Sequence, residues 1–507
     1  MKKFLLILNL FLMIIISTSC NDNKYLKDYT PSEHKYQFST EKLSEVSMKK
    51  TFNIDDYLDD ARLYIKPHSY FKNGMCLQRD AVNCIFGYAK DTDKVAVSLN
   101  GNVYYGTVNE NGRFEVYLPM MNAGGPYNME IITEMGRITI KSVYIGEVYL
   151  FAGQSNMEWQ IWISGNTMKD LYEASDVEND KIRLIRIPNA PSKTPSEEFA
   201  SDAYWFTANK DTVMKFSAVA YIFGKKLQKE LNCPVGLVST AVGGSSIEHW
   251  LSKENYSKVK DIYKPITDSN TPVMTPMLGY NGILHPLKGI NYRGVVWYQG
   301  CSNTYGTENY YDQALRIFIE QCKKDFNHKN LTFTICELAR YGQDPLAYSI
   351  INERINELAK NDDKIAVTRN LDLGNWYDIH PLDKRVIGNR AIDETLRLFY
   401  GKDIEEPVYL KSYKFNDDGT VTLELSRNVK LVNGTNGFEV SNGNKFTYDC
   451  KVEVKDNIVT VSADFEIKEL RYGYTCKMTT EIKNDVSKMV TIYDDNNMPL
   501  DLFSICN

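Results

Sequence analysis

The chain of 507 residues is longer than one hydrophobic core usually serves, so two or three domains are expected. With 43% hydrophobic and 12% aromatic residues it can bury those cores, and nothing in its composition indicates disorder. The net charge of -6 supplies no basic surface for nucleic acid or for an anionic membrane. The expected partners are therefore small or neutral molecules, and the composition indicates no oligomeric state.

The N-terminus has the pattern of a targeting segment. Two lysines precede an apolar run over residues 4–16, which is too short to span a bilayer. The sequence STSC then ends at Cys20 and resembles a bacterial lipobox, whose cysteine becomes lipidated. We expect residues 1–20 to be a signal peptide and residues 21–56 a polar tether. Simple secretion and a buried N-terminal helix are the alternatives.

This pattern predicts export across the inner membrane of a bacterium. The product would be a periplasmic protein or a lipoprotein anchored in the outer membrane, and the lipid on Cys20 would be its contact with a membrane. No other window approaches transmembrane length.

Cysteine and histidine spacing predicts no metal site. The ten cysteines include no CxxC pair, and no Cys/His cluster has zinc spacing. The six histidines are scattered, and neither HExxH nor a Walker loop is present. The cysteines that follow Cys20 are odd in number, so at least one thiol stays free, and their spacing fixes no disulfide. Neither a metal nor an organic cofactor is expected.

Three segments of different periodicity follow the tether. Residues 57–145 hold alternating runs such as KVAVSLNGN, broken by Asn-Gly turns that favour hairpins. Residues 146–402 alternate apolar strands such as GEVYLFAG and YRGVVWYQG with amphipathic helices such as SAVAYIFGKKLQKEL, which is typical of a parallel sheet covered on both faces. Residues 403–507 return to alternating strands. We predict an α/β fold with β-sandwich-like domains at both ends.

Candidate site residues follow the ends of the predicted strands, where open α/β sheets bind ligands. Ser155 follows EVYLFAG, and a strand-to-helix turn there would bring its hydroxyl to the edge of the sheet. Alternatively, Ser155 is a plain N-cap with Glu158 as its capping-box partner. Gly243 and Gly244 end the run STAVGG and either bring a backbone N–H close to a ligand or form an ordinary tight turn.

Two further segments carry polar side chains. Gln299 and Asn303 flank a glycine in WYQGCSN, where side-chain amides donate to an oxyanion or tie down a loop. His380 lies in NWYDIHPLDK, a loop that Pro381 keeps out of a helix, and Asp378 is close enough in sequence to orient the histidine ring. Taken together, these weak signals predict nucleophilic serine chemistry.

These segments resemble the successive blocks of the SGNH (GDSL-type) hydrolases and, more narrowly, the sialate O-acetylesterase family of carbohydrate esterases. The blocks are LFAGQSNMEW, GGSSIEHW, GYNGILHPLKGINYRGVVWYQGCSN and DIHPLDKRVIGNRAI. The flanking segments GMCLQRD, LPMMNAGGPYNMEI, ELRYGY and NNMPLDLF also resemble that family. The resemblance runs from about residue 60 to residue 507. It implies an SGNH-hydrolase-like parallel sheet flanked by helices, between two β-rich domains.

The resemblance also implies roles for the candidate residues. Ser155 would be the nucleophile and His380 its general base, oriented by Asp378. The oxyanion hole would consist of backbone N–H groups and one side-chain amide. Its donors would be Ser155, Gly243 or Gly244, and Gln299 or its rival Asn303.

Two positions depart from the pattern of the family. Cys301 stands where the family usually has Glu, and Tyr377 stands where many SGNH enzymes have Asp three residues before the histidine. Asp378 is therefore the expected partner of His380, Asp372 is a distant second, and a Ser-His dyad is the remaining alternative. We expect Cys301 to be a small buried thiol, because a nucleophilic role would need a low thiol pKa.

The implied function is hydrolysis of O-acetyl esters on carbohydrates, most of all O-acetylated sialic acids, through an acyl-serine intermediate. One alternative is an acetyl esterase on other glycans such as acetyl-xylan. Another is a carbohydrate-binding lipoprotein with weakened catalysis, which the changes at Cys301 and Tyr377 suggest. Trp159 is a candidate contact for sugar rings, although tryptophans lie more often in a core. The other tryptophans with the same two interpretations are Trp162, Trp205 and Trp250.

Overall fold

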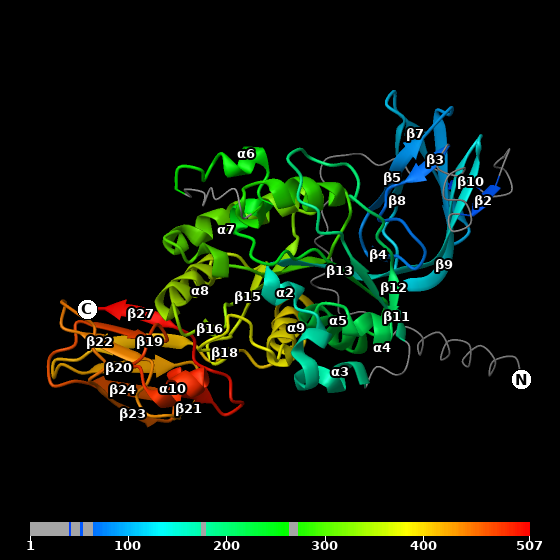
Figure 1. The fold of residues 1–507 in the computed structure, drawn as a ribbon. Helices are drawn as coiled ribbons and strands as arrows, with labels where there is room; N and C mark the ends of the chain where they lie inside the picture. The colour runs from blue at the N-terminus through cyan, green and yellow to red at the C-terminus, as the bar shows by residue number, and fades with distance from the viewer. Residues whose placement is uncertain (1–39, 42–50, 54–63, 174–178, 263–271) are drawn as a thin grey trace, which may run out of the picture.

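A computed structural model of the chain describes residues 40–41, 51–53, 64–173, 179–262 and 272–507. Two β-rich parts lie at opposite ends of a central α/β part, which confirms the predicted fold class (Figure 1). The predicted signal peptide with Cys20, and most of the predicted tether, lie outside the described residues. No helix within the described ranges is both long enough and apolar enough to cross a membrane.

The N-terminal part is built from antiparallel hairpins, as the period-two pattern predicts. Strands β6 and β7 are joined by a tight turn in which Asn100 and Gly101 have φ of 51° and 78°. Two consecutive left-handed residues form the primed turn that Asn-Gly favours. The strands are β1 (Thr40–Glu41), β2 (Thr51–Asn53), β3 (Ile65–Pro67), β4 (Cys76–Gln78), β5 (Asn83–Ala89), β6 (Lys94–Leu99), β7 (Asn102–Val108), β8 (Arg113–Leu118) and β9 (Gly124–Thr133).

Strand β10 (Gly136–Gly153) belongs to both the N-terminal part and the central sheet. Its first half pairs antiparallel with β9, and its second half pairs in parallel with β13 and β14. Register shifts between Ile140 and Ile145 mark the change, as β-bulges do where a strand bends. The predicted boundary at residue 145 falls inside this strand, so continuous backbone joins the two parts.

The central sheet has the strand order β12-β11-β13-β10-β14-β15-β17, and all its strands are parallel except the edge strand β12. Strand β10 lies between β13 and β14, so the order of the strands reverses there and the loops after these three strands meet at one edge. The remaining strands are β11 (Asn179–Arg186), β12 (Phe206–Ala208), β13 (Val235–Ser239), β14 (Gly294–Tyr298), β15 (Thr332–Cys336) and β17 (Ile365–Thr368), with β16 (Arg340–Tyr341) paired to β18 (Gly374–Asn375).

Helices cover both faces of the central sheet (Figure 1). Helices α5 and α9 pack against each other and on one face, and α7 and α8 pack on the other. The long helices are α5 (Ala218–Leu231), α7 (Tyr311–Asp325), α8 (Pro345–Ala359) and α9 (Arg385–Tyr400). The short ones are α2 (Ser155–Glu158), η3 (Ile161–Met168), α3 (Lys169–Glu173), α4 (Lys210–Met214), η4 (Ile247–Trp250), α6 (Lys253–Tyr256), η5 (Pro272–Met274), η6 (Tyr280–Leu284), η7 (His285–Leu287), η8 (Cys301–Asn303) and η9 (Glu308–Tyr310).

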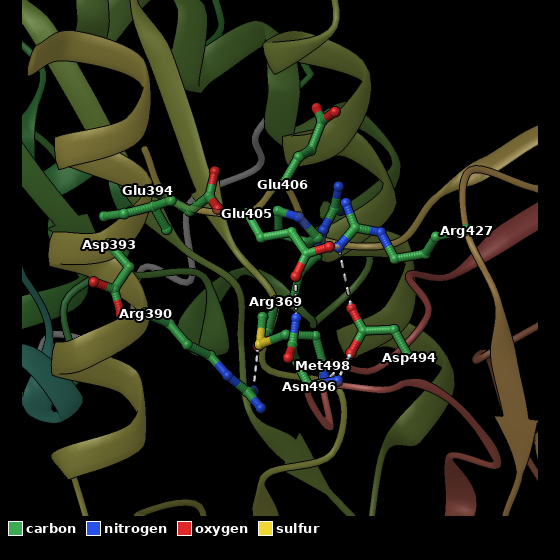
Figure 2. A pocket seen from close by; sticks show the side chains of 12 residues that line it. Arg369, Arg390, Asp393, Glu394, Glu405, Glu406, Arg427, Asp494, Asn496 and Met498 are labelled. Carbon is green, nitrogen blue, oxygen red and sulfur yellow. Dashed lines mark hydrogen bonds and ion pairs between the residues drawn. The ribbon is translucent and has the colours of Figure 1, made fainter. Parts of the chain in front are cut away.

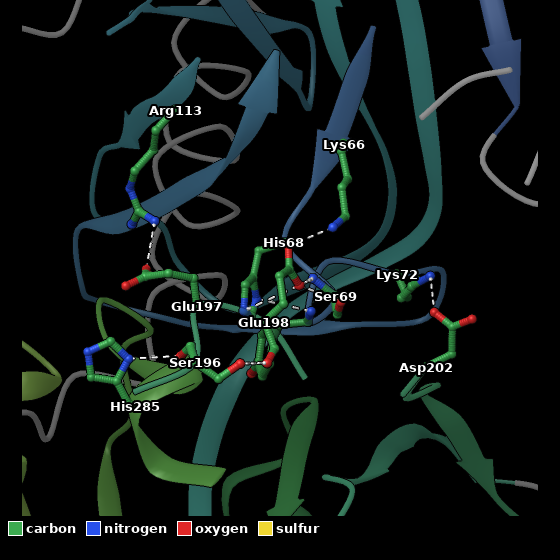
Figure 3. A network of polar contacts seen from close by, with 11 residues as sticks. Lys66, His68, Ser69, Lys72, Arg113, Ser196, Glu197, Glu198, Asp202 and His285 are labelled. Carbon is green, nitrogen blue, oxygen red and sulfur yellow. Dashed lines mark hydrogen bonds and ion pairs between the residues drawn. The ribbon is translucent and has the colours of Figure 1, made fainter. Parts of the chain in front are cut away.

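Polar contacts fix the N-terminal part to the central part (Figure 3). The backbone N–H and the hydroxyl of Ser69 both donate to Glu198 Oε2, at 3.0 and 2.5 Å. Lys72 and Asp202 form an ion pair at 3.3 Å. The loop that precedes β12 is therefore tied to the N-terminal part at more than one point.

The C-terminal part has three small antiparallel sheets around its own apolar core, with β19-β20-β24-β23, β22-β25-β27 and β21-β26 as neighbours. Its elements are β19 (Leu410–Phe415), β20 (Val421–Leu425), β21 (Val429–Leu431), β22 (Phe438–Ser441), β23 (Lys451–Lys455), β24 (Ile458–Ser462), β25 (Glu469–Tyr472), α10 (Thr480–Asn484), η10 (Val486–Met489), β26 (Ile492–Asp494) and β27 (Phe503–Cys506).

Arginines join the C-terminal part to the central part. Figure 2 shows a charged pocket at this junction, in which Arg427 lies beside Glu405 and Asp494. A second arginine, Arg340, is only 3% exposed and reaches from the central part into the C-terminal part. Its guanidinium donates to the backbone carbonyls of Leu371, Tyr474 and Gly473. The hydroxyl of Ser349 also donates to the last two of these carbonyls, so only the Leu371 carbonyl has Arg340 as its sole donor within the described residues.

We expect Arg340→Met to lower the free energy of unfolding by about 3 kcal/mol, because it removes three hydrogen bonds from a buried cation and leaves one buried carbonyl without a donor, while most of the side-chain volume is kept. The midpoint of thermal unfolding and limited proteolysis between the two parts would measure the effect. Lys411→Met, which removes an exposed pair with Glu424, is the matched control and should cause no measurable shift. Equal unfolding midpoints for both variants would contradict the importance of Arg340.

Candidate active site

Ser155 lies at the carboxyl end of β10, which has parallel neighbours on both sides. β10 ends at Gly153, and helix α2 begins at Ser155. Gly153 has φ of 134°, and a Cβ on it would lie 2.2 Å from the carbonyl oxygen of Tyr298 in β14. Only glycine fits so close to the neighbouring backbone, so this residue lets the strand turn directly into the helix.

The capping-box alternative for Ser155 is wrong. The N-cap position belongs to Gln154, whose side chain makes no capping hydrogen bond. The carboxylate of Glu158 accepts instead from the backbone N–H of Gly243 at 2.9 Å and from Arg186 at 2.6 Å. The hydroxyl of Ser155 therefore has no capping role and can meet a side chain from another loop.

The structure brings Ser155, His380 and Asp378 together. His380 Nε2 lies 2.8 Å from Ser155 Oγ. Asp378 Oδ1 lies 3.3 Å from Nδ1 of the same ring and also accepts the backbone N–H of His380 at 2.8 Å. When the proton of the ring is on Nδ1, Nε2 can accept from the serine hydroxyl and Nδ1 faces the carboxylate of Asp378. The three side chains are therefore arranged as a Ser-His-Asp triad.

The other acidic candidate, Asp372, is engaged elsewhere. Both its carboxylate oxygens accept from Arg390, at 2.6 and 2.8 Å. The loop that carries Asp378 is shaped by Asn375, whose side-chain oxygen accepts the backbone N–H groups of Tyr377 at 2.8 Å and Asp378 at 3.1 Å. Asp378 is therefore the carboxylate that this loop presents to the histidine ring.

Trp159 packs against the histidine. Its ring stacks on His380 with the centroids 4.9 Å apart and the planes inclined by 22°. The indole N–H donates to Ser164 Oγ at 2.9 Å, and this hydroxyl donates to the carbonyl of Leu382 at 2.6 Å. Trp159 thus supports the His380 ring, and the contact with sugar rings expected for it stays a prediction.

Two buried residues at this site, Asn156 and Lys384, were missed by sequence reasoning. Lys384 is 0% exposed, and its Nζ donates to Oδ1 of Asn156. Asn156 is 2% exposed, and its Nδ2 donates to the carbonyl of Ile379 at 3.1 Å. The only sequence signal was their position: Asn156 follows Ser155, and Lys384 lies in the same short block as His380.

The two glycines after β13 lie beside the serine. A Cβ on Gly243 would lie 3.6 Å from the Cβ of Ser155. The N–H of Gly243 already donates to Glu158. Gly244 has φ of 75°, and within the described residues its N–H meets no acceptor, nor does that of Ser155. Of the predicted backbone donors, those of Ser155 and Gly244 therefore have no partner among the residues that the structure describes.

Gln299 and Asn303 hold the loop after β13. Gln299 is 0% exposed, and its Nε2 donates to the carbonyl of Ser245 at 3.1 Å and to Asn303 Oδ1 at 2.8 Å. Both hydrogens of this amide are thereby used. Asn303 Nδ2 donates to Glu248 at 3.1 Å, and its second hydrogen has no acceptor in the part of the chain that the structure describes. Of the two predicted amide donors, Asn303 is the one with a hydrogen to spare.

Cys301 is buried, and burial raises the pKa of its thiol to about 11. At neutral pH the thiol is therefore protonated, as expected for a small buried side chain and not for a nucleophile. Each cysteine in the described ranges is a free thiol. The same ranges contain no group of three or more histidine, cysteine or acidic side chains arranged to hold a metal ion.

Burial and charge set the ionisation of the site. The pKa of His380 is lowered from 6.5, first by burial and then by Lys384, while Asp378 acts in the opposite direction. The pKa of Lys384 is lowered to about 7 because burial removes water from its charged form. The histidine is thus neutral at pH 7, the state that a general base needs before it accepts a proton.

Comparisons with known proteins show which sequences and which fold the chain resembles. Residues 145–380 match the family model described as "Carbohydrate esterase, sialic acid-specific acetylesterase". The sialate O-acetylesterase of Homo sapiens is 26% identical over 279 residues, which cover 51% of this chain and 53% of that protein. That of Mus musculus is 24% identical over 308 residues, covering 51% and 56%. The chain thus spans about half the length of these curated relatives.

A solved structure of a carbohydrate acetylesterase from Xanthomonas citri has the same fold. It superposes with a TM-score of 0.77 and 23% identity, and covers 87% of this chain and 99% of that one. This likeness confirms the predicted fold class. The resemblance to the sialate O-acetylesterase family is confirmed over residues 145–380, the part of the chain that the family model matches.

The charges around His380 lead to a pH prediction. In Asp378→Asn the pKa of His380 should fall further below 6.5, because the carboxylate that stabilises the protonated ring is gone. NMR titration of protein labelled on its histidines would measure this pKa, with His380→Asn to assign the signal. A pKa that is unchanged or higher in Asp378→Asn would contradict the contact between the two side chains.

Proposed function

We propose that the chain is a carboxylic ester hydrolase that removes O-acetyl groups from carbohydrates, most of all from sialic acids. The observation that carries the proposal is the distance of 2.8 Å between Ser155 Oγ and His380 Nε2 at the carboxyl edge of the sheet. The sequence similarity also supports it, because the matching relatives are named sialate O-acetylesterases.

In the first half of the reaction, Ser155 Oγ attacks the carbonyl carbon of the acetyl ester while His380 Nε2 takes the hydroxyl proton. A tetrahedral intermediate with a negatively charged oxygen forms. The bond to the sugar oxygen then breaks, and His380 returns the proton to that oxygen. The products are the free sugar hydroxyl and an acetyl group on Ser155. Asp378 stabilises the transient imidazolium and keeps the ring in the required tautomer.

In the second half, a water molecule replaces the sugar. His380 takes one proton from the water as its oxygen attacks the acetyl-serine carbonyl. The second tetrahedral intermediate breaks the bond to Ser155, whose oxygen receives the proton from His380, and acetic acid leaves as acetate. The enzyme returns to its starting state, and the proposed cycle uses neither a metal nor an organic cofactor.

The negative oxygen of both intermediates needs donors that are not already engaged. We assign this role to the backbone N–H groups of Ser155 and Gly244 and to the free amide hydrogen of Asn303. Gly243 and Gln299 are less suitable because their N–H groups donate within the protein. In this proposal Gln299 acts by holding the loop of Gly244 in place.

We expect Ser155→Ala to lower the release of p-nitrophenol from p-nitrophenyl acetate by at least about 10³-fold, because no other nucleophile stands at this position. Ser412→Ala, which changes a serine in β19, is the matched control and should retain the rate of the unmodified protein. Equal rates for the unmodified protein and Ser155→Ala would sink the assignment of the nucleophile.

The choice of substrate depends on charge. Sialic acids carry a carboxylate, whereas the acetylated xylose units of xylan are neutral. Arg186 has a side chain that is 46% exposed and binds Glu158, which in turn binds Gly243 beside the serine. An arginine in this position has donors to spare for the carboxylate of a sialic acid. Trp162, 54% exposed in η3, offers a face for a sugar ring, unlike the buried Trp205 and Trp250.

Arg186→Gln should lower kcat/KM for O-acetylated sialic acid by about 10-fold, because a charge-assisted contact is lost. The rates with acetyl-xylan and p-nitrophenyl acetate should stay within about twofold, since neither carries a carboxylate. Acetate release by the unmodified protein, by Arg186→Gln and by the control Lys181→Gln in the same strand would be compared on all three substrates. Faster release from acetyl-xylan than from the sialic acid would favour the alternative substrate class.

A carbohydrate-binding lipoprotein with weakened catalysis is the alternative from another class. It would bind glycans without releasing acetate even at high protein concentration. The contact between Ser155 and His380 argues against it, because a protein that only binds needs no activated serine. Export and lipidation at Cys20 are proposals that rest on the first twenty residues of the sequence.

A further inference from the structure

Lys384 is a fully buried lysine beside the proposed catalytic residues. It is 0% exposed and occupies the N-cap position of α9. Its Nζ donates to Oδ1 of Asn156, and its backbone N–H donates to Met168 Sδ at 3.3 Å. Burying a lysine costs free energy because the charged form loses its water. Hydrogen bonds and electrostatic contacts of the amine must offset that cost.

The contact between Lys384 and Asn156 bridges the segments that carry Ser155 and His380. Asn156 follows Ser155 in α2, and its Nδ2 donates to the carbonyl of Ile379, directly before His380, at 3.1 Å. A charged lysine can only donate, so it selects the amide orientation in which Oδ1 faces Nζ and Nδ2 faces the carbonyl. Lys384 therefore fixes the amide that joins the serine helix to the histidine loop.

The ring of Trp159 provides a second link. Lys384 Nζ lies 5.3 Å from the centroid of this ring, within the range of a cation–π contact. The same ring stacks on His380 at 4.9 Å. Lys384 thus contacts both groups that hold the histidine loop, the amide of Asn156 and the indole of Trp159.

The charge of Lys384 has no directly bound carboxylate within the described residues. Asp378 and Asp383 act on it from longer range. Burial raises the pKa of the Cys301 thiol to about 11 and that of Cys336 to about 12, so both thiols are neutral. Burial also lowers the pKa of Lys384 to about 7. The titratable groups that face it from the surrounding elements are His380, Asp378, Asp383, Cys301 and Cys336.

We propose that Lys384 is a positioning residue of the esterase site: it holds His380 against Ser155 through Asn156 and Trp159, and its charge controls how readily His380 accepts a proton. The inference rests on the proposed esterase function, in which His380 becomes a cation during each half of the reaction. A charged Lys384 opposes that cation by Coulomb repulsion, and a neutral amine does not. The neutral amine still has hydrogens to donate to Asn156, so it keeps the histidine loop in place.

The expected pH dependence has two steps. As pH rises, kcat/KM first increases when His380 loses its proton, below pH 6.5, because only the neutral ring is a base. It increases again near pH 7, when Lys384 loses its charge and no longer opposes the imidazolium. A lysine that only fills space would give the first step alone.

The first test is Lys384→Met, which keeps the length of the side chain and removes its charge and hydrogen bonds. The pKa of His380, measured by NMR titration, should rise because a nearby positive charge is gone. The step near pH 7 should disappear from the profile of kcat/KM for p-nitrophenyl acetate. kcat at high pH should fall about 10-fold or more, with KM little changed, because the histidine loop is held less well.

The second test is Cys301→Glu, which keeps Lys384 and places a carboxylate beside it. The new opposite charge should raise the pKa of Lys384 and move the second step of the profile upward by about one pH unit or more. This variant decides the question if Lys384→Met fails to fold. A second step that stays near pH 7 in Cys301→Glu would overturn the proposal.

The matched control is Lys226→Met. Lys226 is a partly exposed lysine of α5 that pairs with Asp393 of α9, so the control removes a lysine contact to the same helix away from the site. It should leave the pH profile and the pKa of His380 unchanged. The proposal is overturned if Lys384→Met behaves in the same way. If the unmodified protein and Ser155→Ala release p-nitrophenol equally, the proposed function fails, and the pKa of His380 in Lys384→Met still decides whether Lys384 controls the histidine.

Discussion

The geometry of the site depends on the parallel pairing of β10 with β13 on one side and β14 on the other. Gly153 at the end of β10 pairs with Tyr298 of β14, and Phe151 pairs with Ser239 of β13, so the three strands end at nearly the same level. The segments that follow them therefore leave the sheet at one edge. A slip by one residue would turn every side chain of β10 to the opposite face of a sheet that is buried on both faces. The register of β10, which is fixed by the burial of its apolar side chains, thus sets the position of the serine hydroxyl.

Buried polar side chains fix the conformation of the loop that follows β13. Gln299 binds the carbonyl of Ser245, Asn303 accepts the backbone N–H of Ile247 at 3.0 Å, and Glu158 binds the N–H of Gly243. Each of these groups is bonded to the backbone of the loop after β13, because an unpaired buried polar group would cost about 1–3 kcal/mol. The loop has few ways to move without losing one of these bonds. Such a layer leaves the free donors of the site in a fixed direction before any substrate arrives.

The sequence predicted those helices and strands whose apolar residues recur with a clear period. The apolar strands that end before Ser155, Gly243 and Gln299 and the helices between them lie where periodicity indicated, and Asp378 could be proposed because it is near His380 in sequence. Strand β11 was missed, because NDKIRLIR mixes charged and apolar residues and gains its place only by pairing with β13. Local spacing also could not show which N–H groups are already used, since the partner of Gly243 comes from α2. Contacts between segments distant in sequence decide such details, and no periodicity encodes them.

The structure leads to a different interpretation of Cys301 from the one that the sequence suggested. From the sequence alone, a thiol in place of a carboxylate suggested weakened catalysis. In the fold, Cys301 is buried and interacts electrostatically with Lys384, so a carboxylate at this position would change the charge balance around His380. Burial lowers the pKa of Lys384 to about 7, and a carboxylate at position 301 would oppose this shift more strongly than a neutral thiol does. Because a charged lysine opposes the imidazolium and a neutral one does not, a neutral thiol at position 301 would favour the base near neutral pH. The same change that suggested an inactive site is therefore compatible with an active one whose pH dependence is set by a lysine.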